Sequence, residues 1–306
     1  MAPARVLFIF LDGVGIGEPD PEVNPFLRAR TELPALLTLA GGMVPTLNRP
    51  RTTGAGGRAF PLGATIDVEG LPQSGTGQAA LLTGESAAEM YGRHFGPWTP
   101  VRLRPLVEER SMLRRAADAG RTVAFANAYP RGWPGPRGGK RIAGPPLAAR
   151  GAGVLNRHED ALTNGSAVSS EILNDGWRLH LGHDRVPDIA AQRAGRNLAR
   201  ISRGADLTLY AHYATDSAGH RKDMPAAVAA LARVDEFLQG LLADLPADTL
   251  LLITSDHGNL EDVRTGHTRN PALGIARGPG AERAAELSDI RQVAPLVLEL
   301  LAVDPT

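Results

Sequence analysis

The segment from Thr249 to Ser255 is an apolar run that leads directly into Asp256 and His257. A run of this length and composition predicts a strand that is covered on both faces, as in a parallel sheet. Open α/β sheets carry their functional groups at the carboxyl ends of such strands. The pattern therefore predicts an α/β fold with a carboxylate and an imidazole at one edge of its sheet.

Two further apolar runs end in the same way. Val6 to Leu11 precedes Asp12, and Leu207 to Tyr210 precedes Asp216 and His220. The last two residues are spaced four apart, so both side chains could point the same way from a helix. With a later histidine, the ligand-type residues are Asp12, Asp216, His220, Asp256, His257 and His267.

Six such residues at three strand ends are about the number that two metal ions need. Carboxylates and imidazoles suit Mn²⁺ or Zn²⁺, and the absence of cysteine excludes a thiolate site. Each residue taken singly has an alternative interpretation, because an aspartate at a strand end is often a helix cap or turn residue. A single histidine is likewise often a structural group. The hypothesis of a dinuclear site depends on the whole set.

The glycine-rich segment Gly70 to Gln78 contains Ser74, which precedes an expected helix from Ala79. A serine hydroxyl is a weak nucleophile, but coordination to a divalent cation would lower its pKa. The amides of a helix N-terminus would also attract an anion. Ser74 is therefore a candidate catalytic nucleophile. The alternative is that Ser74 or Thr76 only caps the helix.

In order and spacing, these motifs resemble the alkaline phosphatase superfamily, in particular its branch of cofactor-independent phosphoglycerate mutases and phosphopentomutases. The segment His267-Thr268-Arg269-Asn270-Pro271 fits the branch motif His-Thr-x-Asn-Pro. The resemblance implies that two divalent cations are bound, and it favours Mn²⁺ over Zn²⁺. The implied ligands are Asp12, Ser74, Asp256 and His257 for one ion, and Asp216, His220 and His267 for the other.

The resemblance covers roughly residues 1–90 and 190–306. It implies a mainly parallel sheet flanked by helices, with a metal-binding catalytic core of residues 1–87 and 188–306 and an inserted smaller α/β cap, residues 88–187, that would set substrate specificity. The motifs with which phosphoglycerate mutases hold their substrate have no match in this insertion.

Other patterns in the sequence predict further elements. Helices are expected over Pro105–Ala119, Asp188–Ser202, Pro225–Leu245 and Asp289–Ala302, strands over Thr122–Ala126 and Ala272–Ala276, and a surface loop over Arg49–Gly57.

The insertion is rich in arginine, with thirteen basic residues against three acidic ones between Arg93 and Arg157. A pocket that holds an anion beside two cations needs further positive groups, and arginine suits phosphate or carboxylate. The candidate substrate-binding residues are Arg131, Arg137, Lys140 and Arg141, in a loop rich in glycine and proline. The alternative is that they are solvated surface charges.

Composition agrees with an enzyme, since 306 residues with 43% hydrophobic and 22% charged side chains are enough to bury a sizeable core. The net charge of zero gives no argument for nucleic acid or an anionic membrane as a partner. The first apolar run is too short for a signal peptide, and no run approaches a membrane span. We therefore expect a cytoplasmic protein. An unaligned sequence does not predict its oligomeric state.

The expected activity is phosphoryl transfer from a small phosphorylated metabolite through a phosphoserine at Ser74. A phosphomutase, which is an isomerase, would return the phosphoryl group to a retained alcohol, whereas a phosphomonoesterase, a hydrolase, would pass it to water. The metal core is compatible with both. The segment Ser74-Gly75-Thr76-Gly77-Gln78 lacks the sequence context of the sulfatases of this superfamily. A non-enzymatic alternative is a metal-bound protein whose basic insertion binds an anionic partner such as RNA.

Overall fold

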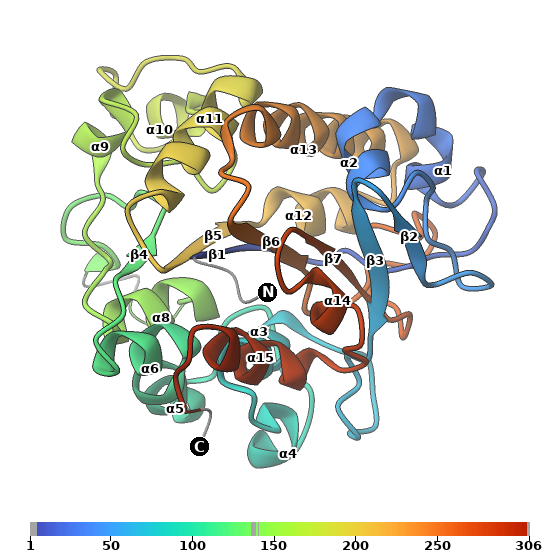
Figure 1. Cartoon of the computed structure of the whole chain (residues 1–306), viewed down its shortest axis with the longest axis horizontal. Helices are drawn as coiled ribbons and strands as arrows, with labels where there is room; N and C mark the ends of the chain where they lie inside the picture. The colour runs from blue at the N-terminus through green and yellow to red at the C-terminus, as the bar shows by residue number, and fades with distance from the viewer. Residues whose placement is uncertain (1–4, 136–138, 140, 305–306) are drawn as a thin grey trace.

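The computed structural model describes residues 5–135, 139 and 141–304, which form one seven-stranded sheet with helices on both faces (Figure 1). The strand order is β2-β3-β7-β6-β1-β5-β4. The strands are β1 (Arg5–Leu11), β2 (Thr52–Gly54), β3 (Gly57–Leu62), β4 (Val123–Phe125), β5 (Leu207–His212), β6 (Thr249–Thr254) and β7 (Ala272–Arg277).

The helices are α1 (Pro25–Arg28), α2 (Pro34–Leu39), α3 (Ser74–Thr83), α4 (Ala87–Tyr91), α5 (Arg104–Arg110), α6 (Met112–Asp118), α8 (Gly144–Gly151), α9 (Glu159–Thr163), α10 (Asp175–Leu179), α11 (Ala191–Ser202), α12 (Ala214–Arg221), α13 (Met224–Asp244), α14 (Ala281–Ala284) and α15 (Val293–Leu300). Short 3-10 turns occupy Arg30–Glu32, Val101–Leu103 and Ile290–Gln292. Within the described part of the chain, none of the helices combines the length and the apolar character that crossing a membrane requires.

Four adjacent strands, β6, β1, β5 and β4, run parallel to one another. Val6 of β1 is in register with Leu207 of β5 and with Leu250 of β6. The carboxyl ends of these three strands therefore lie together at one edge of the sheet. On the other side of β6, strands β7, β3 and β2 pair antiparallel. The predicted α/β fold with a mainly parallel sheet and flanking helices is confirmed.

Both faces of β1 are buried, and its side chains alternate between two hydrophobic clusters. Phe8 and Phe10 belong to the cluster beneath α3, α5, α6, α8 and α15, whereas Leu7 and Ile9 face the cluster with α2, α11 and α13. Figure 1 shows these helices as two layers, with α11 and α13 on one side of the sheet and α3 and α15 on the other. This double burial explains the continuous apolar run in the sequence.

Much of the expected insertion is joined to the same sheet and core. Strand β4 pairs with β5, and helices α5, α6 and α8 share their hydrophobic cluster with α3 and α15. A small separate cluster includes Leu162, Trp177 and Val186, so only the later part of the segment has a core of its own. The division into a catalytic core and a cap at residues 88–187 stays a prediction.

Two predicted elements were wrong in detail. The single helix expected over Pro105–Ala119 is two helices, because Ser111 has an extended backbone and caps α6 by accepting a hydrogen bond from the Arg114 amide. The surface loop expected over Arg49–Gly57 contains β2, which forms a hairpin with β3. The strands expected over Thr122–Ala126 and Ala272–Ala276 are present as β4 and β7.

Candidate metal centre and adjoining pocket

Three side chains meet at the carboxyl ends of β1 and β6. Asp12 follows β1, and Asp256 and His257 follow β6. His257 Nε2 lies 3.4 Å from Asp12 Oδ1 and 3.7 Å from Asp256 Oδ2. All three residues are buried, Asp256 and His257 completely. The parallel register of β1 and β6 thus brings together groups that are separated by more than two hundred residues.

The electrostatics of this cluster favour a cation. Burial raises the pKa of Asp12, and it raises the pKa of Asp256 well above its usual range. Burial alone would lower the pKa of His257, but the neighbouring Asp256 and Asp12 raise it to about 10. Asp12 Oδ1 and Asp256 Oδ2 are buried without a hydrogen-bond donor among the described residues. Buried carboxylate oxygens of this kind suit a divalent cation.

Ser74 is the first residue of α3 and points into this cluster. Its Oγ lies 2.9 Å from His257 Nε2, and the residue is buried. The helix begins at Ser74 rather than at Ala79, and its N-cap is Gln73. The interpretation of Ser74 as an N-cap is therefore wrong, because Ser74 is the first helical residue and its hydroxyl faces the candidate metal ligands. Thr76 instead accepts a hydrogen bond from the Phe95 amide.

A second cluster lies on α12 and in the loop after β6. Asp216 Oδ2 lies 3.2 Å from His220 Nε2, and Asp216 Oδ1 lies 3.6 Å from His267 Nε2. The two histidine Nε2 atoms are 3.2 Å apart. The Pro72 carbonyl lies 2.8 Å from His267 Nδ1, a contact that places the proton on Nδ1 and directs the Nε2 lone pair at the cluster.

Asp216 differs from the other two aspartates in its titration. Burial would raise the pKa of Asp216, but the adjacent His267, the other nearby histidines and the hydrogen bond from Asn259 lower it to about 2. The rings of His257 and His267 stack with their centroids 4.1 Å apart, so the two clusters adjoin. Ligand atoms lie within 4.8 Å of one another in two sets, one of Asp12, Asp256 and His257 and one of Asp216, His257 and His267. His220 is the most exposed of the six.

Glu261 is a site residue that the sequence analysis did not single out. Its buried carboxylate accepts hydrogen bonds from the Gly15 amide at 2.9 Å, the Asn259 amide at 2.7 Å, Thr268 Oγ1 at 2.5 Å and Asn270 Nδ2 at 3.1 Å. Glu261 therefore ties together the loops that carry Asp12, His257 and His267. Its presence in the segment Asp256–Glu261, together with the polar residues after His267, was the available signal.

Two amide side chains orient the aspartates. Gln78, one helical turn after Ser74, donates from Nε2 to Asp12 Oδ2 at 3.1 Å and accepts from the Gly144 amide at 2.9 Å. Asn259 donates to Asp216 Oδ1 at 2.6 Å. Each aspartate is thus held through one oxygen, which leaves the other oxygen free to face the cluster.

A pocket of about 390 Å³ opens from Asp12, Ser74 and Asp216. The other residues that line it are Gln78, Pro97, Trp98, Tyr129, Trp133, Arg141, Ala143, Pro146, Ser170, Tyr213 and Ser217. Of the four candidate substrate-binding residues, Arg141 lines this pocket. Arg131 does not line it and forms ion pairs with Glu159 and Asp160. Arg137 and Lys140 lie outside the described residues.

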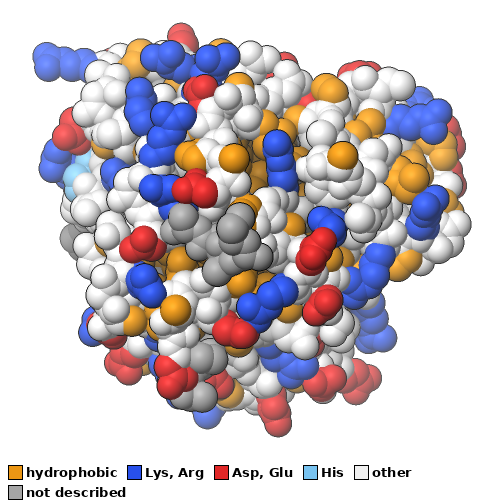
Figure 2. All heavy atoms as spheres, in the orientation of Figure 1, with side chains coloured by type: hydrophobic (Ala, Val, Ile, Leu, Met, Phe, Trp, Pro, Cys, Tyr) orange, Lys and Arg blue, Asp and Glu red, His pale blue; other side chains and the backbone are white. Residues whose placement is uncertain are grey.

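Several other arginines of the basic segment have structural partners. Arg157 is half-buried and donates to the carbonyls of Phe125 and Ser166, and Arg110 pairs with Glu85. Figure 2 shows positive and negative side chains interspersed over the visible face of the molecule. The charge imbalance in the sequence is thus partly offset by acidic groups and carbonyls that folding brings to these arginines.

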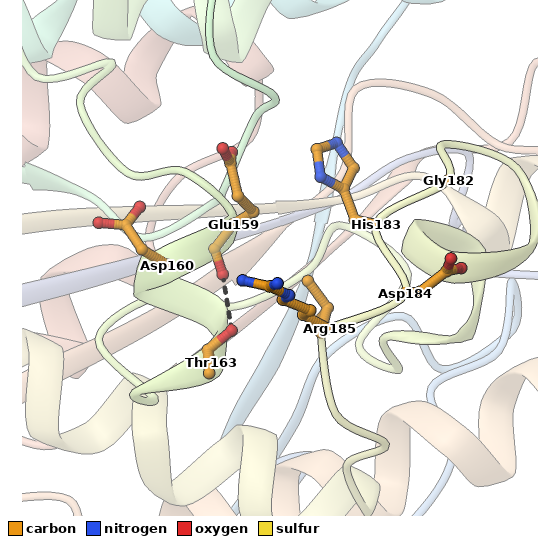
Figure 3. Close-up of a pocket in the computed structure, with 8 residues that line it drawn as sticks. Glu159, Asp160, Thr163, Gly182, His183, Asp184 and Arg185 are labelled. Atoms are coloured by element: carbon orange, nitrogen blue, oxygen red, sulfur yellow. Dashed lines mark hydrogen bonds between the residues drawn. The ribbon is translucent and has the colours of Figure 1, made fainter.

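A larger cavity of about 570 Å³ lies elsewhere, between α9 and the loop at residues 182–186. In Figure 3, Glu159, Asp160 and Thr163 come from α9, and His183, Asp184 and Arg185 come from the loop. The dashed line there is the hydrogen bond from Thr163 to the Glu159 carbonyl. None of the six candidate metal ligands lines this cavity, which is therefore separate from the site around Ser74.

The sequence model of the Metalloenzyme superfamily matches residues 187–305. This segment contains five of the six candidate metal ligands, whereas Asp12 and Ser74 precede it. Among curated proteins, the phosphopentomutase of Deinococcus radiodurans is 37% identical over 150 residues, which are 43% of this chain and 39% of that protein. A 2,3-bisphosphoglycerate-independent phosphoglycerate mutase of Paracoccus denitrificans is 33% identical over 132 residues, or 40% of this chain and 26% of that protein. The matched part is thus well under half the length of these relatives.

Solved structures share the fold over almost the whole chain. The PH0037 protein of Pyrococcus horikoshii has a TM-score of 0.58 and 14% identity, with 99% of this chain and 98% of that chain covered. The alkaline phosphatase of the Antarctic bacterium TAB5 has a TM-score of 0.54 and 12% identity, with 99% of both chains covered. These similarities place the sheet and its flanking helices in a known architecture.

Proposed function

We propose that this chain is a metal-dependent enzyme of the alkaline phosphatase superfamily and that it transfers the phosphoryl group of a phosphomonoester through Ser74. The observation that carries the proposal is the position of Ser74. Ser74 lies at the start of α3, and its Oγ is 2.9 Å from His257 Nε2. Ser74 also lines a pocket together with Asp12 and Asp216. A nucleophile, candidate metal ligands and space for a substrate therefore meet at one point.

The residues present fit two divalent cations, since each cluster offers carboxylate and imidazole atoms and the first has buried oxygens without donors. Asp12, Asp256, His257 and Ser74 would hold one ion, and Asp216, His220 and His267 the other. Mn²⁺ is the proposed metal, and Zn²⁺ is the alternative that the same ligands accept. When bound, the ions would lower the pKa of the serine hydroxyl and neutralise charge on the phosphoryl oxygens.

In the proposed reaction, Ser74 Oγ forms a bond to phosphorus as the bond from phosphorus to the leaving oxygen breaks. The serine proton is lost, and the leaving alcohol gains a proton. Ser74 lies at the N-terminus of α3, whose positive dipole end would attract the phosphoryl group, as helix N-termini do for anions. Gln78 and Asn259 hold Asp12 and Asp216 in place, so little reorganisation accompanies the transfer.

The second step defines the class of enzyme. We favour a phosphomutase, in which a retained alcohol takes the phosphoryl group from Ser74, because the two curated relatives compared above are mutases. A phosphomonoesterase, in which water takes it, is the second candidate. It is supported by the alkaline phosphatase whose fold matches over 99% of both chains. A small phosphorylated metabolite is the proposed partner, and the cytoplasm is the proposed location.

The test is a screen for phosphate release and isomerisation over phosphosugars, phosphoglycerates and phosphomonoesters of apolar and aromatic alcohols in the presence of Mn²⁺, with the bound metal quantified. Wild-type protein is expected to turn over at least one substrate and to yield a phosphopeptide that contains Ser74 in mass spectrometry. Ser74→Ala should lose both signals, and the exposed-site control Ser288→Ala should keep both. Equal turnover by wild type and Ser74→Ala would refute the role of Ser74. A metal-loaded wild type that is inert and unphosphorylated would favour the non-enzymatic anion-binding alternative.

A further inference from the structure

The pocket beside Ser74 has a wall of aromatic rings. Trp98, Tyr129, Trp133 and Tyr213 line it together with Pro97 and Pro146. They come from segments that lie far apart in the sequence, namely the loop after α4, the segments after β4 and the residue that follows β5. Folding thus builds an apolar surface next to a nucleophile that is otherwise surrounded by charged groups.

Three of these rings, those of Tyr129, Trp133 and Tyr213, are supported from behind by the hydrophobic core. Tyr129 stacks on the buried Phe125 with ring centroids 6.0 Å apart, and Tyr213 meets the buried Phe10 edge-on at 6.2 Å. Trp133 lies against Tyr129 with centroids 4.3 Å apart. Rings held in this way lose little freedom when a ligand contacts them, which favours binding.

The two phenol groups add no charge to the wall. Burial raises the pKa of Tyr129 to about 12, and burial raises the pKa of Tyr213 well above its usual range. At neutral pH both side chains are uncharged, so they do not repel a phosphoryl group. Among the described residues that line the pocket, Arg141 alone carries a positive charge.

We propose that the substrate is a phosphomonoester whose leaving alcohol carries a planar aromatic ring, an inference that rests on the proposed function. With phosphorus at Ser74, the alcohol would extend along the pocket and its ring would contact Trp133, Tyr129 and Trp98. Aromatic faces bind a flat apolar group by burial and offset stacking. A small polyhydroxylated alcohol would instead leave most of this wall without a matching partner.

The test compares two phosphates whose leaving alcohols have similar basicity, 2-phenylethyl phosphate and n-propyl phosphate. For the wild type with Mn²⁺ we expect kcat/KM, measured as release of the alcohol on formation of phosphoserine, to be at least about tenfold higher for the phenylethyl ester, the scale on which apolar pockets discriminate. Trp133→Ala should bring this ratio close to one, and Trp133→Phe should restore most of it. Leu181→Ala, at an exposed apolar residue outside the pocket, should leave the ratio unchanged.

A binding measurement separates this proposal from the proposed reaction. Tryptophan fluorescence of Ser74→Ala is titrated with 2-phenylethyl phosphonate and with n-propyl phosphonate, which cannot be hydrolysed. Tighter binding of the aryl phosphonate, lost in a Trp133→Ala background, supports the substrate class even if no turnover is found. Equal or weaker binding of the aryl compound overturns it, and turnover that favours n-propyl phosphate overturns it while leaving phosphoryl transfer intact.

Discussion

The Oε2 atom of Glu261 accepts a hydrogen bond from the Gly15 amide at 2.9 Å, which links the loop after β6 to the loop after β1. The same oxygen accepts from the Asn259 amide, and the other carboxylate oxygen accepts from Thr268 and Asn270. One buried side chain therefore sets the relative positions of the loops that carry the candidate metal ligands, although it contacts none of those ligands through a hydrogen bond that the structure describes.

Glu261→Gln should destabilise the protein and weaken metal binding. The amide nitrogen of glutamine would replace one carboxylate oxygen of Glu261 and would face the two hydrogen-bond donors that this oxygen accepts from. Groups left unpaired in the interior in this way lower the stability of the protein by about 1–3 kcal/mol. Loss of such supporting bonds typically lowers metal affinity by about 10–100-fold. Urea unfolding and calorimetric Mn²⁺ titration measure the two effects. The control is Glu286→Gln, at an exposed position, and equal results for the two variants would contradict the role of Glu261.

Metal ions should stabilise the folded protein. Binding to the native state alone adds about 2.7 kcal/mol when the free metal concentration is about 100 times Kd. We therefore expect Mn²⁺ to raise the unfolding temperature above that measured in a chelator. Asp256→Asn, which removes a buried carboxylate of the first cluster, should lose most of this increase, whereas the exposed Asp184→Asn should keep it. An unfolding temperature that does not respond to Mn²⁺ would argue against the metal centre.

Gly75→Ala should disturb the nucleophile without changing its chemistry. A Cβ atom at Gly75 would lie 2.2 Å from the Trp98 carbonyl oxygen and 2.6 Å from that of Phe95, both of them backbone atoms. Relief of this overlap would shift the start of α3, with a loss of about 1–3 kcal/mol of stability. A displacement of Ser74 by about 1 Å would lower kcat by about a hundredfold.

Gly204→Ala is the matched control for this change, because its Cβ would meet only the Ile201 carbonyl at 3.6 Å. Circular dichroism melting and steady-state kinetics provide the measurements. If Gly75→Ala were as stable and as active as Gly204→Ala, the close approach of α3 to the Trp98 backbone would not position Ser74.

His212 should make the protein sensitive to acid. Burial lowers the pKa of His212 to about 4, and its Nδ1 lies 2.7 Å from the Ser170 carbonyl. The unfolded chain, with a histidine pKa near about 6.5, takes up the proton first. The neutral, buried His212 therefore contributes fully to the free energy of unfolding above pH ~6.5. About 3 kcal/mol of this free energy is lost progressively as the pH falls toward ~4.

Urea unfolding at pH 7.5 and at pH 4.5 in the presence of chelator measures this loss. His212→Asn retains a side-chain donor for the Ser170 carbonyl but does not titrate, so its stability should fall less between the two pH values. His180→Asn, at an exposed histidine, should behave like the wild type. Identical pH dependence in all three proteins would show that His212 does not control acid sensitivity.

The sequence alone predicted the strands that carry the site, because a strand covered on both faces must be apolar along its whole length. The groups that follow β1, β5 and β6 could then be placed together, since parallel strands end at the same edge of a sheet. Asp12, Asp256 and His257 lie within a few ångströms of one another for this reason. The identity of the metal, the role of Ser74 and the reaction stay predictions that the experiments above test.

Only the tertiary structure decided what surrounds that edge. The break at Ser111, the hairpin of β2 and the ion pairs of Arg131 depend on contacts between distant segments, which no local pattern encodes. The same holds for the four-point attachment of Glu261 and for the aromatic wall of Trp98, Tyr129, Trp133 and Tyr213. Strand periodicity is a local property that burial imposes on consecutive residues, whereas the lining of a pocket is set by which surfaces of separate elements pack together.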